Sequence, residues 1–266
     1  MEGSDTHPTA AFTLLVNGPE AEIELERAAL LIAAHARPDL DVGAELDGID
    51  RLAGGCAGPE LVDLRDHLFG TLGFSGNTDD YYDPANSYLD RVVAQRRGIP
   101  ITLSVLTIAV ARRLGLDLVG VGLPGHFLVG ARGDDDLFID PFSGGRVLDG
   151  DEVEALFLAL HGADAPFSPA MLRPVGSRAV LTRMLNNLLG IFAARRDARS
   201  RLWALRLRAA VPGATIDERA EVAAALAATG EYAAASRWLQ ELAREAPGAV
   251  GESYLRSAER LRACLN

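Results

Sequence analysis

Apolar residues recur at helical spacing through the first third of the chain. Residues 20–37 show this spacing and stop before Pro38, and residues 40–55 and 59–74 repeat it. Such spacing predicts amphipathic helices that each bury one face. Glycines close to the ends of the second and third segments fit helix termination, because glycine tolerates the left-handed cap conformation. A turn-rich segment, 75–88, then separates these helices from the middle of the chain.

The middle third combines helices with short strands. Residues 87–98 predict a helix that ends at Gly98, and residues 99–115 predict a second helix with Pro100 in its first turn, where the missing N–H of proline costs nothing. This second helix is apolar on most faces, so we expect it to be buried against a sheet. Three strands are expected to follow it, at 116–123, 126–132 and 136–141, the last two as a hairpin.

The last third is again helical, and its segments look like antiparallel helix pairs. The segments are 178–196, 198–213, 215–230 and 231–248. The last two, with Gly230, Tyr232, Ala235 and Pro247, resemble one tetratricopeptide repeat. We therefore expect three regions: helices at 1–78, an α+β core at 79–175 and tetratricopeptide-like helices at 176–266.

Composition and charge narrow the functions open to the chain. All 26 basic residues of the 266 are arginine, which excludes a Walker-type phosphate loop, a Schiff-base mechanism and a catalytic lysine. The formal net charge of −11 opposes non-specific binding to nucleic acid or to an acidic membrane. We therefore expect neither nucleic acid nor membrane as a partner.

The two cysteines, Cys56 and Cys264, lie far apart and lack the spacing of metal ligands. We expect free thiols, as in a reducing compartment, and neither a metal nor a cofactor. The first twenty residues lack the basic region of a signal peptide, and no apolar stretch approaches the roughly 18 residues of a membrane span. The expected location is the cytoplasm.

His126 and Asp140 are the main candidates for chemistry. If residues 133–135 form the hairpin turn, these two residues lie as diagonal neighbours on one face of adjacent strands. An aspartate placed there can hold the imidazole tautomer and stabilise its cation, as in the orienting half of a nucleophilic triad. The alternative is a core histidine paired with aspartate for structural reasons alone.

A glycine pattern near His126 suggests a different chemistry, which we reject. Gly120, Gly122 and Gly125 match G-x-G-x-x-G, but Pro124 and a strand follow where dinucleotide binding requires a helix.

Three motifs carry a family resemblance. They are "PANSYLDRVVAQRRGIPITLS", "GLPGHFLV" and "FIDPFSGG", at 84–104, 122–129 and 138–145. Together with the flanking helices, they make nearly the whole chain resemble the SirB-type transglutaminase-like proteins. The resemblance implies a papain/transglutaminase-like α+β core, in which one helix packs on an antiparallel sheet, flanked by N-terminal helices and by C-terminal tetratricopeptide-like helix pairs.

The resemblance also locates a missing nucleophile. Enzymes of the wider superfamily carry a cysteine at the N-terminus of the core helix, where the helix dipole lowers the pKa of its thiol. Their motif aligns on Gly98, Arg112 and Gly115, and the cysteine position falls on Pro100. Ser104 lies one helical turn further along the same face and is the candidate substitute, whereas Thr102 points elsewhere. A serine in an apolar helix otherwise bonds a carbonyl of the preceding turn.

Three interpretations follow from the sequence. The one we favour is a transglutaminase-like protein without its thiol, in which His126 and Asp140 bind an unidentified small ligand and the C-terminal helices bind a protein partner. The second is a serine-dependent hydrolase or acyltransferase that uses Ser104, His126 and Asp140. The third is a structural or regulatory scaffold that has no small-molecule site.

Overall fold

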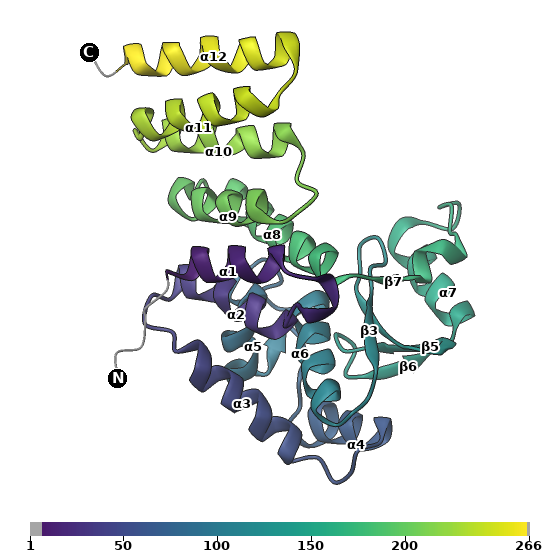
Figure 1. Ribbon diagram of the computed structural model, residues 1–266. Coiled ribbons are helices and arrows are strands. Elements are labelled where there is room, and N and C mark those ends of the chain that lie inside the picture. The colour runs from purple at the N-terminus through teal and green to yellow at the C-terminus, as the bar shows by residue number, and fades with distance from the viewer. Residues whose placement is uncertain (1–6, 265–266) are drawn as a thin grey trace. The chain divides into compact units, whose positions relative to one another are not determined.

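The computed structural model describes residues 7–264, which divide into two compact units (Figure 1). One unit is Glu20–Met184. The other combines the chain before Glu20 with the chain after Met184, and the boundary between them falls within helix α8 (Ser177–Ala194).

Unit 20–184 contains one antiparallel sheet, a small parallel ladder and surrounding helices. The helical elements are η1 (Glu20–Glu22), α2 (Leu25–Ala36), α3 (Val42–Gly54), α4 (Leu61–Arg65), the π-helical η2 (Asp66–Thr71), η3 (Pro84–Ser87), α5 (Leu89–Gln95), α6 (Pro100–Arg113), α7 (Gly150–His161) and η4 (Pro169–Leu172). The strands are β1 (Ser75–Gly76), β2 (Arg97–Gly98), β3 (Leu118–Val121), β4 (Leu128–Ala131), β5 (Asp134–Asp140), β6 (Arg146–Leu148) and β7 (Pro174–Val175).

Five strands form the sheet in the order β6-β5-β4-β3-β7, and every neighbouring pair is antiparallel. Side chains on its two faces belong to different cores. Phe138 and Leu148 cluster with Val153 and Phe157 of α7. Ile139 is also fully buried but points to the opposite face, because side chains alternate along a strand, and α6 packs against β3 and β4. Figure 1 shows α6 and α7 on different sides of the sheet.

Helix α6 is the centre of unit 20–184. Eleven of its 14 residues are buried, and it contacts α2, α3 and α5 as well as the sheet. Pro100 occupies the first helical position, as expected, because a proline there removes no intrahelical hydrogen bond. A helix that is apolar on nearly every face requires cover on all sides, and the N-terminal helices and the sheet together provide it.

A buried carboxylate ties the C-terminal end of α6 to the N-terminal helices. Glu26 of α2 is 2% exposed, and its Oε1 accepts hydrogen bonds from Arg112 Nη2 at 2.5 Å and Arg113 Nη1 at 2.8 Å. Arg113 also pairs with Asp50 of α3. The two cations compensate the cost of taking the Glu26 carboxylate out of water, so three helices are held at one point.

The second unit is built from helices within the described residues. They are α1 (Pro8–Asn17), α9 (Ala198–Ala210), α10 (Ile216–Ala228), α11 (Tyr232–Glu245) and α12 (Gly248–Ala263), with the end of α8. Successive helices from α9 to α12 contact one another, and α1 contacts α9 (Figure 1). Polar bonds reinforce the apolar core, since Trp238 Nε1 donates to the Arg219 carbonyl at 2.8 Å and Ser236 Oγ to the Ala258 carbonyl at 2.9 Å.

The α+β fold class is confirmed, and the differences from expectation are local. The helix expected at 87–98 ends at Gln95, because Arg96 takes a left-handed conformation with φ of 56° and residues 97–98 pair as β2. The hairpin turn is Arg132–Gly133 rather than 133–135, and an irregularity after Gly130 takes up the extra residues. The register beyond it is the expected one, with Val129 opposite Ile139.

The two compact units have different boundaries from the three regions expected from the sequence. The division into three domains stays a prediction. Residues 20–184 include most of the expected N-terminal helical region and reach into α8. Helix α1, from the start of that region, belongs with the C-terminal helices.

Gly144 and Gly145 are adjacent and both have a positive φ, but only Gly145 lacks space for a side chain. Gly144 and Gly145 have φ of 69° and 74°, but a Cβ on Gly145 would lie 2.1 Å from Phe69 Cδ2, whereas one on Gly144 would meet nothing within 4 Å. We expect Gly144→Ala to cost the left-handed penalty of about 1–2 kcal/mol. Gly145→Ala should cost a further ~1–3 kcal/mol, because the ring must move. Urea denaturation of both variants measures the difference, and equal losses would contradict this packing.

Candidate functional site

The loop before β4 positions His126. This residue lies two positions before Leu128, where the strand begins, rather than within the strand as expected. Its backbone N–H donates to the Leu123 carbonyl at 3.0 Å, and Gly125 has φ of 73°, which glycine adopts without steric cost. The tight turn directs the His126 ring towards the end of β5, where Asp140 is the last residue.

His126 and Asp140 are in direct contact. Nε2 of His126 lies 3.0 Å from Oδ1 of Asp140, and the side chains are 9% and 3% exposed. The approach is close, but its angle is too poor for a well-aligned hydrogen bond. In the neutral ring, the carboxylate favours the tautomer with hydrogen on Nε2 and a lone pair on Nδ1. No hydrogen bond of Nδ1 occurs within residues 7–264.

A turn after β5 holds the Asp140 carboxylate. Oδ1 accepts hydrogen bonds from the backbone N–H groups of Phe142 at 3.0 Å and Ser143 at 3.2 Å, and Oδ2 accepts one from Ser143 Oγ at 2.7 Å. Both oxygens are thus fixed by the chain that follows them. The carboxylate is oriented even without His126, so it acts as the fixed partner of the pair.

These contacts shift the titration of Asp140. Burial acts to raise the pKa of the Asp140 carboxyl, but the interaction with His126 and the bonds from Ser143 outweigh it and hold the pKa below its ordinary value. Asp140 is therefore ionised at neutral pH, and the site carries a buried negative charge beside the imidazole.

Arg183 of α8 anchors the loop that carries His126. Its Nη2 donates to the carbonyls of Leu123 at 2.8 Å and His126 at 2.6 Å. The guanidinium carbon lies 5.4 Å from the centroid of the Phe127 ring, within range of a cation–π interaction. Burial lowers the pKa of Arg183, while Tyr81 acts to raise it. An arginine remains charged despite such a shift, so a fixed cation lies behind the histidine loop.

Aromatic rings border the pair on the side of the 77–83 loop. The Phe142 ring meets the His126 ring edge-on with centroids 6.0 Å apart, and Tyr81 meets Phe142 at the same distance. Tyr82 is 72% exposed. The buried side chain of Asn86 holds this loop, because its Nδ2 donates to the carbonyls of Asp80 at 2.7 Å and Tyr81 at 3.2 Å.

Helix α6 presents hydroxyls but no thiol. Pro100 is buried at the first helical position, and Ser104 and Thr102 are both 0% exposed. Neither hydroxyl has a hydrogen-bond partner in the described chain, so Ser104 does not bond the preceding turn, as a serine in an apolar helix commonly does. Ser104 Oγ therefore makes no hydrogen bond to His126. The structure brings His126 and Asp140 together and leaves Ser104 outside their hydrogen-bond network.

The two cysteines are free thiols. Burial, and secondarily Asp63, raise the pKa of the Cys56 thiol, and its sulfur lies 3.9 Å from the Leu52 carbonyl oxygen. Cys264 is exposed at the end of α12. A raised thiol pKa disfavours the thiolate, so Cys56 is not an activated thiol.

The described residues hold neither a metal-binding cluster nor a membrane-spanning helix. Residues 7–264 contain no group of three or more histidine, cysteine or acidic side chains that could hold a metal ion. Across the same residues, every helix is too short or too polar to cross a bilayer.

The fold and the histidine–aspartate pair agree with the family comparison. The transglutaminase-like superfamily domain matches residues 24–186, more than half of the chain. The chain therefore belongs to the transglutaminase-like superfamily.

Individual relatives come from bacteria and from mammals. The chain is 46% identical to a UPF0162 protein of Xylella fastidiosa over 138 residues, which cover 50% of this chain and 49% of that protein. A UPF0162 protein of Pseudomonas aeruginosa is 32% identical over 166 residues, 60% of this chain and 58% of that protein. Human F-box only protein 21 is 38% identical over 142 residues, 50% of this chain and 22% of that protein.

The matched segment spans about half the length of the first of these relatives. No solved structure matches the chain significantly.

Sequence reasoning found the pair but missed the residues that hold it. Ser143 has a local signal, since D-P-F-S places a serine three residues after the aspartate, which is a common turn pattern. Arg183 has none, because it lies 57 residues from His126 and bonds only to backbone carbonyls.

The bonds to Asp140 predict an acid-dependent stability. Because the native pKa is depressed, the contribution of Asp140 is present above its unfolded pKa of about 3.9 and is lost as the pH falls through the native value. Asp140→Asn should lower the free energy of unfolding by about 1–3 kcal/mol at neutral pH, and the gap to the wild type should narrow in acid. Urea denaturation at about pH 7 and pH 3 measures both values.

Asp117→Asn is the control for that comparison, because Asp117 is exposed and pairs only with Arg132 at the surface. A stability gap for Asp140→Asn that is equal at both pH values would contradict the assignment.

Proposed function

We propose that the chain is a transglutaminase-like protein of the SirB type that lacks a covalent nucleophile and binds a ligand at His126 and Asp140. The main support is the buried contact of 3.0 Å between His126 Nε2 and Asp140 Oδ1, together with Pro100 at the start of α6. The orienting half of an acyl-transfer device is intact, while the position that the superfamily resemblance assigns to the thiol has no reactive atom.

The chemistry of the pair indicates what it binds. Asp140 engages Nε2, so Nδ1 is the ring nitrogen left for a ligand, and in a triad the nitrogen turned away from the aspartate serves the nucleophile. A ligand that presents a hydroxyl or an amide N–H can donate a hydrogen bond to Nδ1. Tyr81 and Tyr82 supply apolar contact area beside it.

The relatives support a modular role. The segment similar to this chain makes up 22% of human F-box only protein 21 and about half of a bacterial UPF0162 protein. A core found beside such different neighbouring sequence fits a module that binds, with its consequences set by the rest of each protein.

We propose that the second unit engages a protein partner through tetratricopeptide-like helices. A hollow of about 470 Å³ lies between α1, α9 and the following helices, and Trp238, Arg206 and Arg219 line it. An aromatic side chain with neighbouring arginines is typical of surfaces that bind other proteins. The unpaired thiols of Cys56 and Cys264 favour a cytoplasmic location for this activity.

A serine-dependent acyl transfer is the second candidate. Ser104 Oγ has no acceptor in the described chain, so its hydrogen is available to a base. Its complete burial opposes this candidate, because a substrate must reach the hydroxyl.

A fluorophosphonate that labels activated serines separates the two candidates. We expect no adduct on the folded wild-type protein, because Ser104 is inaccessible and has no hydrogen bond to His126. Intact-mass spectrometry reads the result, with Ser104→Ala and His126→Ala as controls. A single adduct that both variants abolish would establish serine chemistry and overturn the proposal.

Restoring a thiol tests whether the site is a degenerate acyl-transfer site. In Pro100→Cys, the new thiol should be alkylated by iodoacetamide at about pH 6 at least about tenfold faster than Cys56, because the helix N-terminus and His126 favour the thiolate. Adding His126→Ala should remove most of the advantage. Mass mapping of the alkylated peptides measures both rates.

A thiol at position 100 that reacts only after unfolding would show a closed site and contradict ligand binding there. A fast rate that is insensitive to His126→Ala would contradict the role assigned to the histidine.

A further inference from the structure

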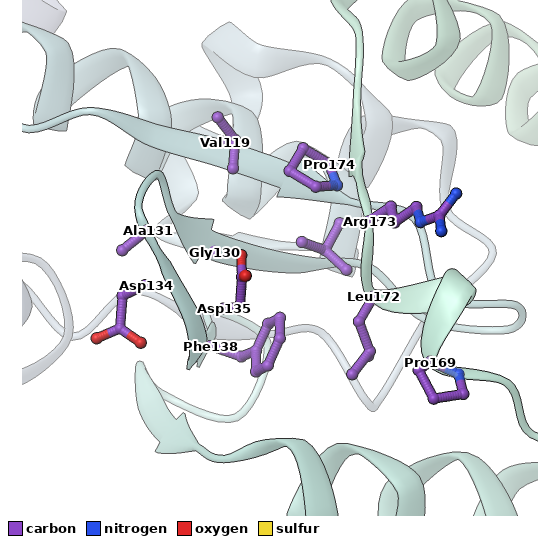
Figure 2. Close-up of a pocket in the computed structure, with 11 residues that line it drawn as sticks. Val119, Gly130, Ala131, Asp134, Asp135, Phe138, Pro169, Leu172, Arg173 and Pro174 are labelled. Atoms are coloured by element: carbon purple, nitrogen blue, oxygen red, sulfur yellow. The ribbon is translucent and has the colours of Figure 1, made fainter.

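A hollow at the other end of the β4–β5 hairpin has no part in the histidine site. It measures about 280 Å³, and its lining comes from β3, β4 and β5 on one side and from the segment 169–174 on the other (Figure 2). Val121 and Phe138 lie on the α7 side of the sheet, and Leu172 packs against the same cluster. The hollow is therefore apolar where it meets the sheet.

A missing side chain creates the space. Gly130 lies opposite Phe138 in the ladder, and a Cβ there would be 3.2 Å from Val121 Cγ2 and 3.8 Å from Phe138 Cδ1. Gly130 has no positive φ, so the backbone does not require glycine at this position. Glycine at this position leaves space above the sheet between the side chains of Val121 and Phe138.

One carboxylate at this hollow has no partner. The Asp135 carboxylate makes no hydrogen bond or ion pair with any of residues 7–264. Its neighbours are occupied, since Asp134 Oδ1 accepts from the Asp136 N–H at 3.1 Å and Asp136 Oδ1 accepts from the Gly150 N–H at 2.7 Å. Asp135 and Gly130 both line the hollow, and in Figure 2 the Arg173 guanidinium extends away from Phe138 and Leu172.

We propose that this hollow binds a small organic monocation, a primary amine with an apolar body. The body lies against Val121, Phe138 and Leu172, and the ammonium group pairs with Asp135. The apolar floor provides most of the contact area, and the single unpaired carboxylate selects the charge. Acidic ligands are disfavoured, because Asp134 and Asp135 border the hollow together.

The volume limits the ligand to a small one. Ligand pockets span roughly 300–1,000 Å³, so this hollow is just below that range. A ring system with a short aminoalkyl chain fits such a space, whereas an extended peptide does not. The assignment is independent of the function proposed for His126 and Asp140, which lie at the opposite end of the hairpin.

Three probes that share one scaffold test the proposal. Tryptamine carries an ammonium group, tryptophol a hydroxyl and indole-3-propionate a carboxylate on the same indole. Isothermal titration calorimetry of the full chain should show saturable binding of tryptamine. An exposed ion pair contributes a factor of up to about five, so tryptophol should bind about threefold to fivefold more weakly. Indole-3-propionate should bind more weakly still.

Single substitutions assign the binding to this hollow. Asp135→Asn should reduce tryptamine affinity to that of tryptophol and leave tryptophol affinity unchanged. Asp134→Asn is the matched control and should have the smaller effect, because its carboxylate already accepts a backbone N–H. Gly130→Val should abolish binding of both probes by filling the space, and Gly130→Ala is the milder variant if the valine unfolds the sheet.

Absence of saturable tryptamine binding would overturn the proposal. Equal affinity for tryptamine and tryptophol, or tryptamine affinity that Asp135→Asn leaves unchanged, would also overturn it. Thermal unfolding of the Asp135→Asn protein verifies its fold, and this variant should fold normally because residue 135 is exposed.

Discussion

The burial of α6 is the constraint on which the unit 20–184 depends. A helix with 11 of 14 residues buried cannot lie on a surface, so both a helical layer and a sheet must form around it. The buried Glu26 carboxylate next to its C-terminal end is compatible with this burial because Arg112 and Arg113 pair with it. The start of the helix carries a proline, which fits the first helical position. The same helix thus fixes the core from both the helical layer and the sheet.

The candidate site depends on charge held in place by backbone. Asp140 is oriented by the turn that follows it, and the loop of His126 is held by Arg183 from α8. The Asp140 carboxylate is held by the turn after β5, and the Arg183 guanidinium holds the loop before β4. The His126 ring is therefore positioned by two segments that are each fixed by other bonds. These bonds stabilise two loops, so they contribute to the fold whether or not the site is catalytic. They also fix the geometry of the pair before any other group approaches it, because the positioning cost is met during folding.

The sequence predicted those features that local chemistry determines. Pro100 marked the start of α6, and hydrophobic alternation with the hairpin gave the register that places His126 diagonal to Asp140. The turn position was wrong because the irregularity after Gly130 has no clear sequence signature. The role of Arg183 could not be predicted, because hydrogen bonds to backbone carbonyls far away in the chain leave no sequence pattern. The missing back-bond of Ser104 was equally hidden, since the sequence does not reveal which rotamer a packed helix allows.

The pairing of α1 with the C-terminal helices affects the order in which the protein can fold during synthesis. Phe12 and Val16 of α1 are fully buried, and Asn17 bonds to the carbonyl of Ala210, 193 residues later. On the ribosome α1 emerges before the unit 20–184, yet its partner α9 emerges only after that whole unit has been made. An early fold of that unit brings the two ends of a long loop closer and reduces the entropy lost when α1 meets α9. The inserted unit therefore prepares the assembly of the unit that encloses it in sequence.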